Sequence, residues 1–200
     1  MKKFIKLLIC LAICLCLCIS ASAATQYTVV KGDSMWKIAV RYEIGLSEII
    51  NANPQIKNPN LIYPGDVLTI PTIDSNILDY EQQVVNLVNQ IRRNYGLSEL
   101  SVNWQLARVA RYKSEDMRTN KYFSHTSPTY GSPFDMMRAF NLSFNYAGEN
   151  IAMGYQSPSA VVNGWMNSTG HRANILNPNF TQIGVGYVSS GNYWTQMFIG

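Results

Sequence analysis

The period of the hydrophobic positions changes several times along the chain, and each change marks an expected element. In the first part, β-forming residues give way to apolar positions at the three- and four-residue spacing of short helices. Gly32 can supply the turn between the first strand and helix, and Asp33 or Ser34 can cap that helix. The expected order is strand, helix, helix, strand over residues 26–71, with elements near 26–30, 35–42, 47–53 and 67–70.

A second pattern, with longer helical stretches, fills the rest of the chain. The expected elements are helices at 79–95, 103–119, 134–140 and from Ser157-Pro158 onward, then strands at 182–188 and 193–199. Helices followed by a terminal hairpin predict an α+β domain over residues 78–200. A short polar stretch at 72–77 is the expected linker between the two modules.

The first 23 residues are typical of a signal peptide. Lys2, Lys3 and Lys6 precede an apolar run from residue 7 to 19, and Ala21-Ser22-Ala23 offers a cleavage site. We expect a mature chain that begins near Ala24 and has no stable membrane anchor, with an uncleaved anchor as the alternative.

All four cysteines lie inside this leader, at positions 10, 14, 16 and 18. None follows a small residue, so the pattern lacks a lipoprotein signal of the usual kind. Residues 24–200 therefore have neither disulfides nor cysteine-bound metal, and their stability must come from packed cores.

Charge gives no indication of a nucleic-acid partner. The formal net charge is +4, but after the leader 13 basic residues face 12 acidic ones. One basic cluster on the helix near 103–119 is interleaved with acids: Arg108, Arg111, Lys113, Glu115, Asp116 and Arg118. This interleaving is typical of a solvated helix face, so we expect no nucleic acid to bind.

Candidate chemistry lies between residues 123 and 176, which include both histidines. His125 and His171 stand in short polar stretches, and Glu149 lies between them in Ala147-Gly148-Glu149-Asn150-Ile151. Two imidazoles and a carboxylate match a metal site or a proton-transfer site in residue type. The three residues are too far apart to be a local motif, so the fold must bring them together.

Several segments of the second module carry a family resemblance. "FSHTSP", "AGENIAMG" and "VVNGWMNSTGHRANILNPNFTQIGVGY" resemble the bacterial branch of the CAP superfamily, which comprises cysteine-rich secretory, antigen-5 and pathogenesis-related proteins. The resemblance covers about residues 78–200 and implies an α/β/α sandwich around a small antiparallel sheet with an open cleft.

The first module resembles the lysin motif (LysM) over its whole length. The matching segments are "YTVVKGDSMWKIA", "EIINANPQI" and "LIYPGDVLTIP". The resemblance implies a βααβ module over residues 26–71 that binds N-acetylglucosamine-containing glycans such as peptidoglycan. The glycan-binding positions that it implies are Gly32, Asp33, Ser34 and Met35 on one side of a groove, and Asn53, Pro54, Gln55 and Ile56 on the other. The alternative is that these residues only form turns and fill a small core.

In the CAP family a cleft tetrad of two histidines and two glutamates is typical. His125, Glu149 and His171 match three of its members, but the second glutamate would follow Trp165, where the chain has Met166, Asn167 and Ser168. We expect His125 and His171 as ligands of a divalent metal such as zinc, with Glu149 and Asn167 in the cleft. The alternatives are metal-free acid–base work, passive ligand binding, and a hydrogen-bonded cluster that only fixes loops.

Together these features predict a secreted protein of the cell wall or spore coat, in which the LysM module anchors the CAP domain to peptidoglycan. Wall or spore-coat proteins are the expected further partners. The alternative function is a metal-dependent hydrolase of wall polymers or peptides. A carrier of apolar ligands is a third hypothesis, suggested by the aromatic-rich stretch at 140–146.

Overall fold

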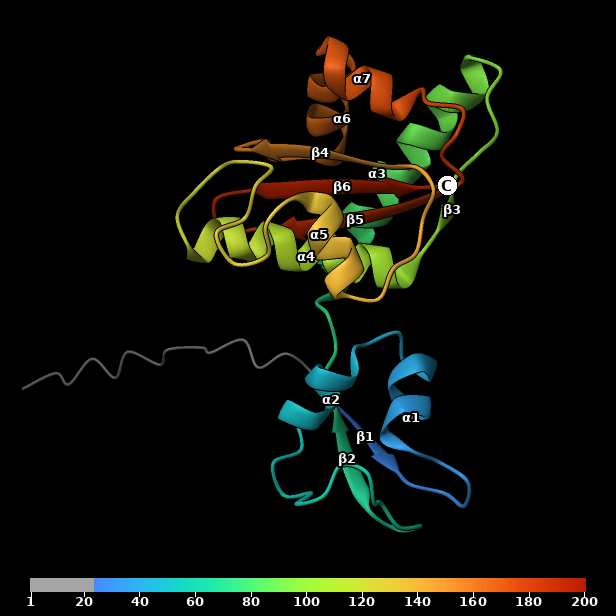
Figure 1. Ribbon diagram of the computed structural model, residues 1–200, viewed down its shortest axis with the longest axis vertical. Coiled ribbons are helices and arrows are strands. Elements are labelled where there is room, and N and C mark those ends of the chain that lie inside the picture. The colour runs from blue at the N-terminus through green and yellow to red at the C-terminus, as the bar shows by residue number, and fades with distance from the viewer. Residues whose placement is uncertain (1–23) are drawn as a thin grey trace, which may run out of the picture.

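The computed structural model describes residues 24–200, which form two modules joined by a short connection (Figure 1). The predicted signal peptide, residues 1–23, lies outside the described residues. No helix between residues 24 and 200 is long and apolar enough to cross a membrane.

The N-terminal module has the expected strand, helix, helix, strand order. Its elements are β1 (Thr25–Thr28), α1 (Met35–Arg41), α2 (Leu46–Asn51) and β2 (Val67–Ile70). The two strands pair antiparallel, with Thr25 opposite Ile70. Of the two expected caps, Ser34 is the one used: its hydroxyl accepts a hydrogen bond from the Lys37 amide. The helices pack their apolar sides on the sheet and enclose a core of eight buried residues, which are Val29, Met35, Ile38, Ala39, Ile44, Ile49, Leu68 and Ile70.

The C-terminal module is a sheet between two layers of helices. Its elements are α3 (Ser75–Asn94), β3 (Ser101–Val102), α4 (Trp104–Thr119), α5 (Pro133–Ala139), β4 (Ala147–Met153), α6 (Pro158–Met166), α7 (Thr169–Ile175), β5 (Gln182–Val188) and β6 (Tyr193–Ile199). The strand order is β3-β5-β6-β4. The β5–β6 and β6–β4 pairs are antiparallel, while β3 pairs parallel with β5.

Two cores lie on opposite faces of this sheet. Helices α3 and α6 pack their valines and Trp165 on one face, next to Trp194 and Phe198. Helices α4 and α5 cover the other face, next to Met197 and Ile199. Figure 1 shows the resulting three layers, with β4 at one edge of the sheet and α7 beside it. The predicted α+β class and the α/β/α sandwich are confirmed.

The structure differs from the sequence expectation in four elements, one of which is the short helix α7 that carries His171 where only a turn was expected. Helix α3 begins at Ser75, earlier than the expected residue 79, because the Asp74 carboxylate caps it by accepting the Asn76 amide. It thus takes in part of the stretch expected to be linker. Strands β3 and β4 were not expected: β3 has two residues, and β4 contains Gly, Glu and Asn, which are poor strand formers.

Helix α4 lies directly on strand β5, because Gly184 and Gly186 leave no side chain between them. A Cβ atom at Gly184 would lie 2.3 Å from the Ala107 nitrogen, and one at Gly186 would lie 2.1 Å from the Arg111 nitrogen. The Ser114 hydroxyl lies 2.9 Å from the Gly186 carbonyl oxygen, so the helix is also hydrogen-bonded to the strand. Both neighbours are backbone atoms of a helix, so they cannot move aside like a flexible side chain.

A buried carboxylate closes the open side of β5 beyond the short β3. Glu81 of α3 accepts the Tyr187 amide at 3.0 Å and pairs with Arg111 of α4 at 2.6 Å. Burial raises the pKa of Glu81 more than Arg111 and the Tyr187 amide lower it. The ion pair therefore joins α3, α4 and β5, but its net stabilisation is limited by the desolvation of the carboxylate.

A charged contact joins the two modules. Arg108 of α4 donates to both carboxylate oxygens of Glu48 on α2 and to the Ser47 hydroxyl. Its guanidinium also lies 5.0 Å from the centre of the Phe140 ring. The connection between the modules, residues 71–74, is four residues long.

We predict that Gly186→Ala lowers the free energy of unfolding of the C-terminal module by about 2–3 kcal/mol, because the added methyl group forces α4 away from β5. Denaturant unfolding followed by the fluorescence of the buried Trp165 and Trp194 measures the change. Gly170→Ala is the matched control, since nothing lies within 4 Å of its added carbon. Equal stability of the two variants would show that the helix and strand can separate at little cost.

Candidate functional site

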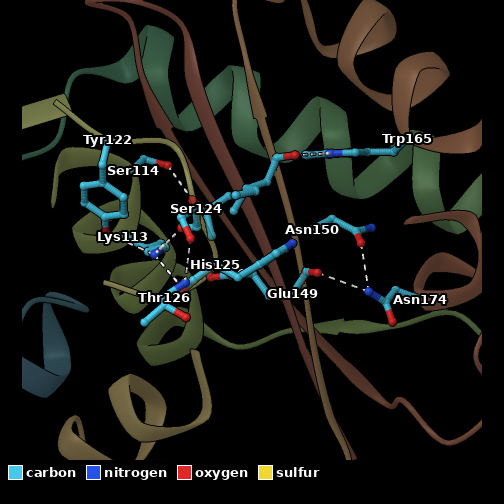
Figure 2. Close-up of polar contacts among 12 residues, drawn as sticks. Lys113, Ser114, Tyr122, Ser124, His125, Thr126, Glu149, Asn150, Trp165 and Asn174 are labelled. Carbon is cyan, nitrogen blue, oxygen red and sulfur yellow. Dashed lines mark hydrogen bonds and ion pairs between the residues drawn. The ribbon is translucent and has the colours of Figure 1, made fainter. Parts of the chain in front are cut away.

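The first site is built around Glu149 of β4, whose side chain is 2% exposed. Its Oε1 lies 2.7 Å from Nδ1 of His125, which belongs to the loop between α4 and α5. An ionised carboxylate only accepts, so the imidazole donates from Nδ1 and its Nε2 remains unused. Figure 2 shows the side chain of Glu149 extending from β4 to the His125 imidazole. The imidazole is half exposed, which leaves it open to a ligand.

Helix α4 supports the loop that carries His125. Lys113 is fully buried, and its ammonium donates to the carbonyls of Ser124 and His125, each at 2.8 Å, and to the Tyr122 hydroxyl at 3.0 Å (Figure 2). The expectation of a solvated face is therefore wrong for Lys113, because this side of α4 lies under the loop.

Asp116, one turn further along α4, fixes the same loop and is also buried. Its carboxylate accepts from the Tyr122 and Ser127 hydroxyls, from the Thr129 hydroxyl and from the Asn120 amide. Burial acts to raise the pKa of Asp116, but these four hydrogen bonds outweigh it and lower the pKa. The solvated-face expectation is wrong for Asp116 as well.

His171 lies on α7, near the other side of β4. Its carbonyl accepts the side-chain amide of Asn150 at 3.1 Å. Asn174 of the same helix donates to the Glu149 carbonyl and to the Asn150 amide oxygen (Figure 2). Burial and the nearby His125 lower the pKa of His171, which favours its neutral imidazole.

This arrangement sets limits on metal binding. Among residues 24–200 no three His, Cys, Asp or Glu side chains are grouped as ligands of one ion. The unused Nε2 of His125 and the neutral ring of His171 fit the chemistry of two imidazole ligands, and Glu149 orients one of them. The second oxygen of Glu149 is buried and accepts no hydrogen bond from any described residue.

The second site is a groove of about 200 Å³ in the N-terminal module. One wall comes from the β1–α1 loop and the start of α1, the other from the segment before β2, and α2 lies between them. The lining residues are Asp33, Ser34, Met35, Trp36, Leu46, Ile50, Pro59, Asn60, Leu61 and Ile62. Trp36 is 61% exposed and Leu61 is 51% exposed, so the groove offers two apolar surfaces to solvent.

The sequence profile of the cysteine-rich secretory protein family, CAP, matches residues 85–198. This match covers more than half of the chain and includes both histidines and Glu149. The chain belongs to the CAP family. The LysM domain profile matches residues 27–71, so the N-terminal module is a LysM domain.

Two relatives each match about two thirds of the chain. YkwD of Bacillus subtilis (strain 168) is 56% identical over 132 residues, which are 66% of this chain and 51% of YkwD. A crystal structure of an extracellular SCP-domain protein from Bacillus anthracis is 38% identical with a TM-score of 0.60, over 68% of this chain and 47% of that one. The chain thus spans about half the length of these relatives.

A third relative matches a shorter part of the chain. The probable autolysin SsaALP of Staphylococcus aureus (strain NCTC 8325 / PS 47) is 42% identical over 55 residues. These residues are 28% of this chain and 20% of the relative.

The structure pairs His125 with Glu149 directly but leaves Asn167 apart. Asn167 is the exposed C-cap residue of α6, and it lines a hollow between α6 and α7 together with Met166, Thr169 and Arg172. Among the described residues its side chain makes no hydrogen bond to Glu149 or to either histidine. Its place in the cleft stays a prediction.

The predicted glycan positions of the LysM domain fall into two groups. Asp33, Ser34 and Met35 line the groove, while Gly32 precedes it with a φ of +94° that favours glycine. The Asp33 carboxylate also accepts from the Tyr27 hydroxyl, which lowers the pKa of Asp33. One of its oxygens thus already takes part in a hydrogen bond within the domain.

The residues from Asn53 to Ile56 lie outside the groove lining. Asn53 is 1% exposed; its amide donates to the Ile49 and Thr69 carbonyls and accepts the Thr69 amide. Gln55 donates to Asn53, Ile56 packs on the core, and Pro54 is exposed. Their glycan role stays a prediction, but the contacts of Asn53 are structural.

The second groove wall, residues 59–62, and Trp36 were not predicted from the sequence. A signal was present: Trp36 lies on α1 away from the apolar positions 35, 38 and 39, so its ring must point outward.

We predict that Asn53→Ala weakens the LysM domain by about 2–3 kcal/mol, because it leaves buried backbone groups of Ile49 and Thr69 without partners. Amide hydrogen exchange at Thr69 measures the loss of protection. Asn51→Ala is the control, since Asn51 is exposed at the end of α2. Unchanged exchange at Thr69 would contradict the structural role.

Proposed function

We propose that this chain is a secreted protein of the bacterial cell wall, in which the LysM domain binds N-acetylglucosamine-containing glycan and localises the CAP domain. The groove beside Trp36 is the observation that carries the proposal. The comparisons support it: one relative over part of the chain is a probable autolysin, and the relative of known structure is an extracellular protein that contains an SCP domain. A spore-coat location is the alternative that the sequence predicted.

The groove has the chemistry that such glycans require. The apolar face of a sugar ring stacks on an aromatic ring, and Trp36 presents one at the groove edge. Leu46, Ile50 and Leu61 offer apolar contacts to acetyl methyl groups, while Asp33 and Ser34 offer polar ones. A single domain with so small a groove binds weakly, and repeated glycan units at the wall raise its occupancy.

For the CAP cleft we propose ligand binding at His125 and His171, with a divalent metal such as zinc as the ligand to test. Glu149 supports His125 in the manner of a carboxylate that orients a metal-binding imidazole. Two protein ligands leave half of the four-coordinate sphere of zinc to water or to a polar group of a partner. No described observation favours the hydrolase or the carrier of apolar ligands over this function.

We predict that Trp36→Ala reduces retention on insoluble peptidoglycan at least fivefold, because the stacking surface is worth about 1 kcal/mol or more. Sedimentation of the protein with purified peptidoglycan measures it. Tyr63→Ala is the matched control: Tyr63 is an aromatic residue of the same domain, 59% exposed and outside the groove lining. Equal losses in both variants, or none in Trp36→Ala, would move the glycan site elsewhere.

For the cleft, we predict that zinc binds with one-to-one stoichiometry in a calorimetric titration and that His125→Ala and His171→Ala each abolish it. Glu149→Gln is expected to weaken binding about tenfold, because it removes the carboxylate that orients His125. Thr169→Ala, an exposed change on α7, serves as control. Zinc binding that survives the loss of either histidine would refute the site.

A further inference from the structure

Lys113 is an unusual residue to find inside this domain. Its side chain is fully buried, and burial lowers its pKa because the charged amine is removed from water. Among the described residues it forms no direct ion pair, although Glu149 and Asp116 act on it electrostatically from a distance. Burying a lysine without a carboxylate in contact lowers the stability of the domain, unless other contacts compensate for the loss of water.

The three donors of the ammonium match three acceptors. Two are the consecutive carbonyls of Ser124 and His125, and the third is the Tyr122 hydroxyl. Tyr122 in turn donates to Asp116, one helical turn from Lys113. The amine is therefore fully hydrogen-bonded, and two of its three bonds go to the main chain beside and at the candidate histidine.

The loop that carries His125 has little regular structure of its own. Between α4 and α5 the only described bridge pairs Ser127 with Gly131, after the histidine. The main chain at His125 is thus fixed by side chains from α4. Because the imidazole is half exposed, packing alone does not hold it against Glu149.

We propose that Lys113 is a positioning residue: by holding the Ser124 and His125 carbonyls it keeps the His125 imidazole on Glu149 in the Nδ1–H tautomer, with Nε2 free for a ligand. The inference rests on the cleft site proposed above. Its test uses the imidazole itself without added metal, so failure of metal binding and failure of this inference are distinguishable.

The test is nitrogen-15 NMR of the two histidines in a protein of residues 24–200 at about pH 8, above the ordinary histidine pKa. His125→Gln assigns the signals. In the unmodified protein we expect the His125 nitrogens to show the Nδ1–H tautomer. In Lys113→Met we expect that signature to be lost and the two nitrogen shifts to move toward an average of both tautomers.

A matched control lies on the same helix. Arg118→Met removes a cationic side chain that is 38% exposed and bonded to Glu115, and it should leave the His125 shifts unchanged. Circular dichroism and tryptophan fluorescence confirm that each variant is folded. Should Lys113→Met fail to fold, Lys113→Gln keeps a shorter, uncharged donor and is expected to lose the Nδ1–H signature in part.

The chain also permits a chemical rescue, since residues 24–200 have no cysteine. In Lys113→Cys, alkylation of the unfolded protein with 2-bromoethylamine forms a carbon–sulfur bond, expels bromide and gives an ammonium at the length of lysine. After refolding, the Nδ1–H signature should return. An unchanged signature in any folded variant that lacks the ammonium, or no return on alkylation, would overturn the proposal.

Discussion

The close contact between α4 and β5 is the constraint on which the CAP domain depends. Two glycines on one strand bring the helix backbone against the sheet, so the rotation and height of α4 are fixed by backbone atoms. The side chains of α4 therefore start from fixed backbone positions. The polar residues along α4 are therefore held at defined distances from the sheet, and three of its basic residues reach other parts of the molecule.

Those three contacts run in different directions from one helix. Arg111 crosses to Glu81 and completes the open side of β5. Arg108 points to α2 of the LysM domain. Lys113 lies under the loop of His125. The charges of α4 thus connect a sheet edge, a neighbouring domain and the candidate cleft, whereas in the sequence they look like an ordinary solvated face.

The sequence predicted those elements whose periodicity is long and uninterrupted. The hairpin of β5 and β6 and most helices lie within a few residues of their expected bounds. Strand β4 was not predicted because its central residues, Glu149 and Asn150, are polar. They are buried because they hydrogen-bond to residues far away in the sequence, which are His125, His171 and Gln196. A local sequence pattern cannot show such contacts. For the same reason, only the family resemblance predicted that His125 and Glu149 lie close together. The burial of Lys113 could not be predicted from the sequence. In the LysM domain, the two walls of the groove are far apart in sequence, and Asn53 looks like a loop residue although its amide bridges α2 and β2.

The four-residue connection between β2 and α3 sets how far the two domains can separate. A fully extended chain of four residues spans only about 14 Å. While the LysM domain is on a glycan strand, the CAP cleft therefore remains within a small volume around that strand. Under the proposed function, molecules attached to the wall therefore meet His125 and His171 at a high local concentration, whereas freely diffusing molecules do not. The short connection would then favour ligands by their location in the wall, in addition to their chemistry.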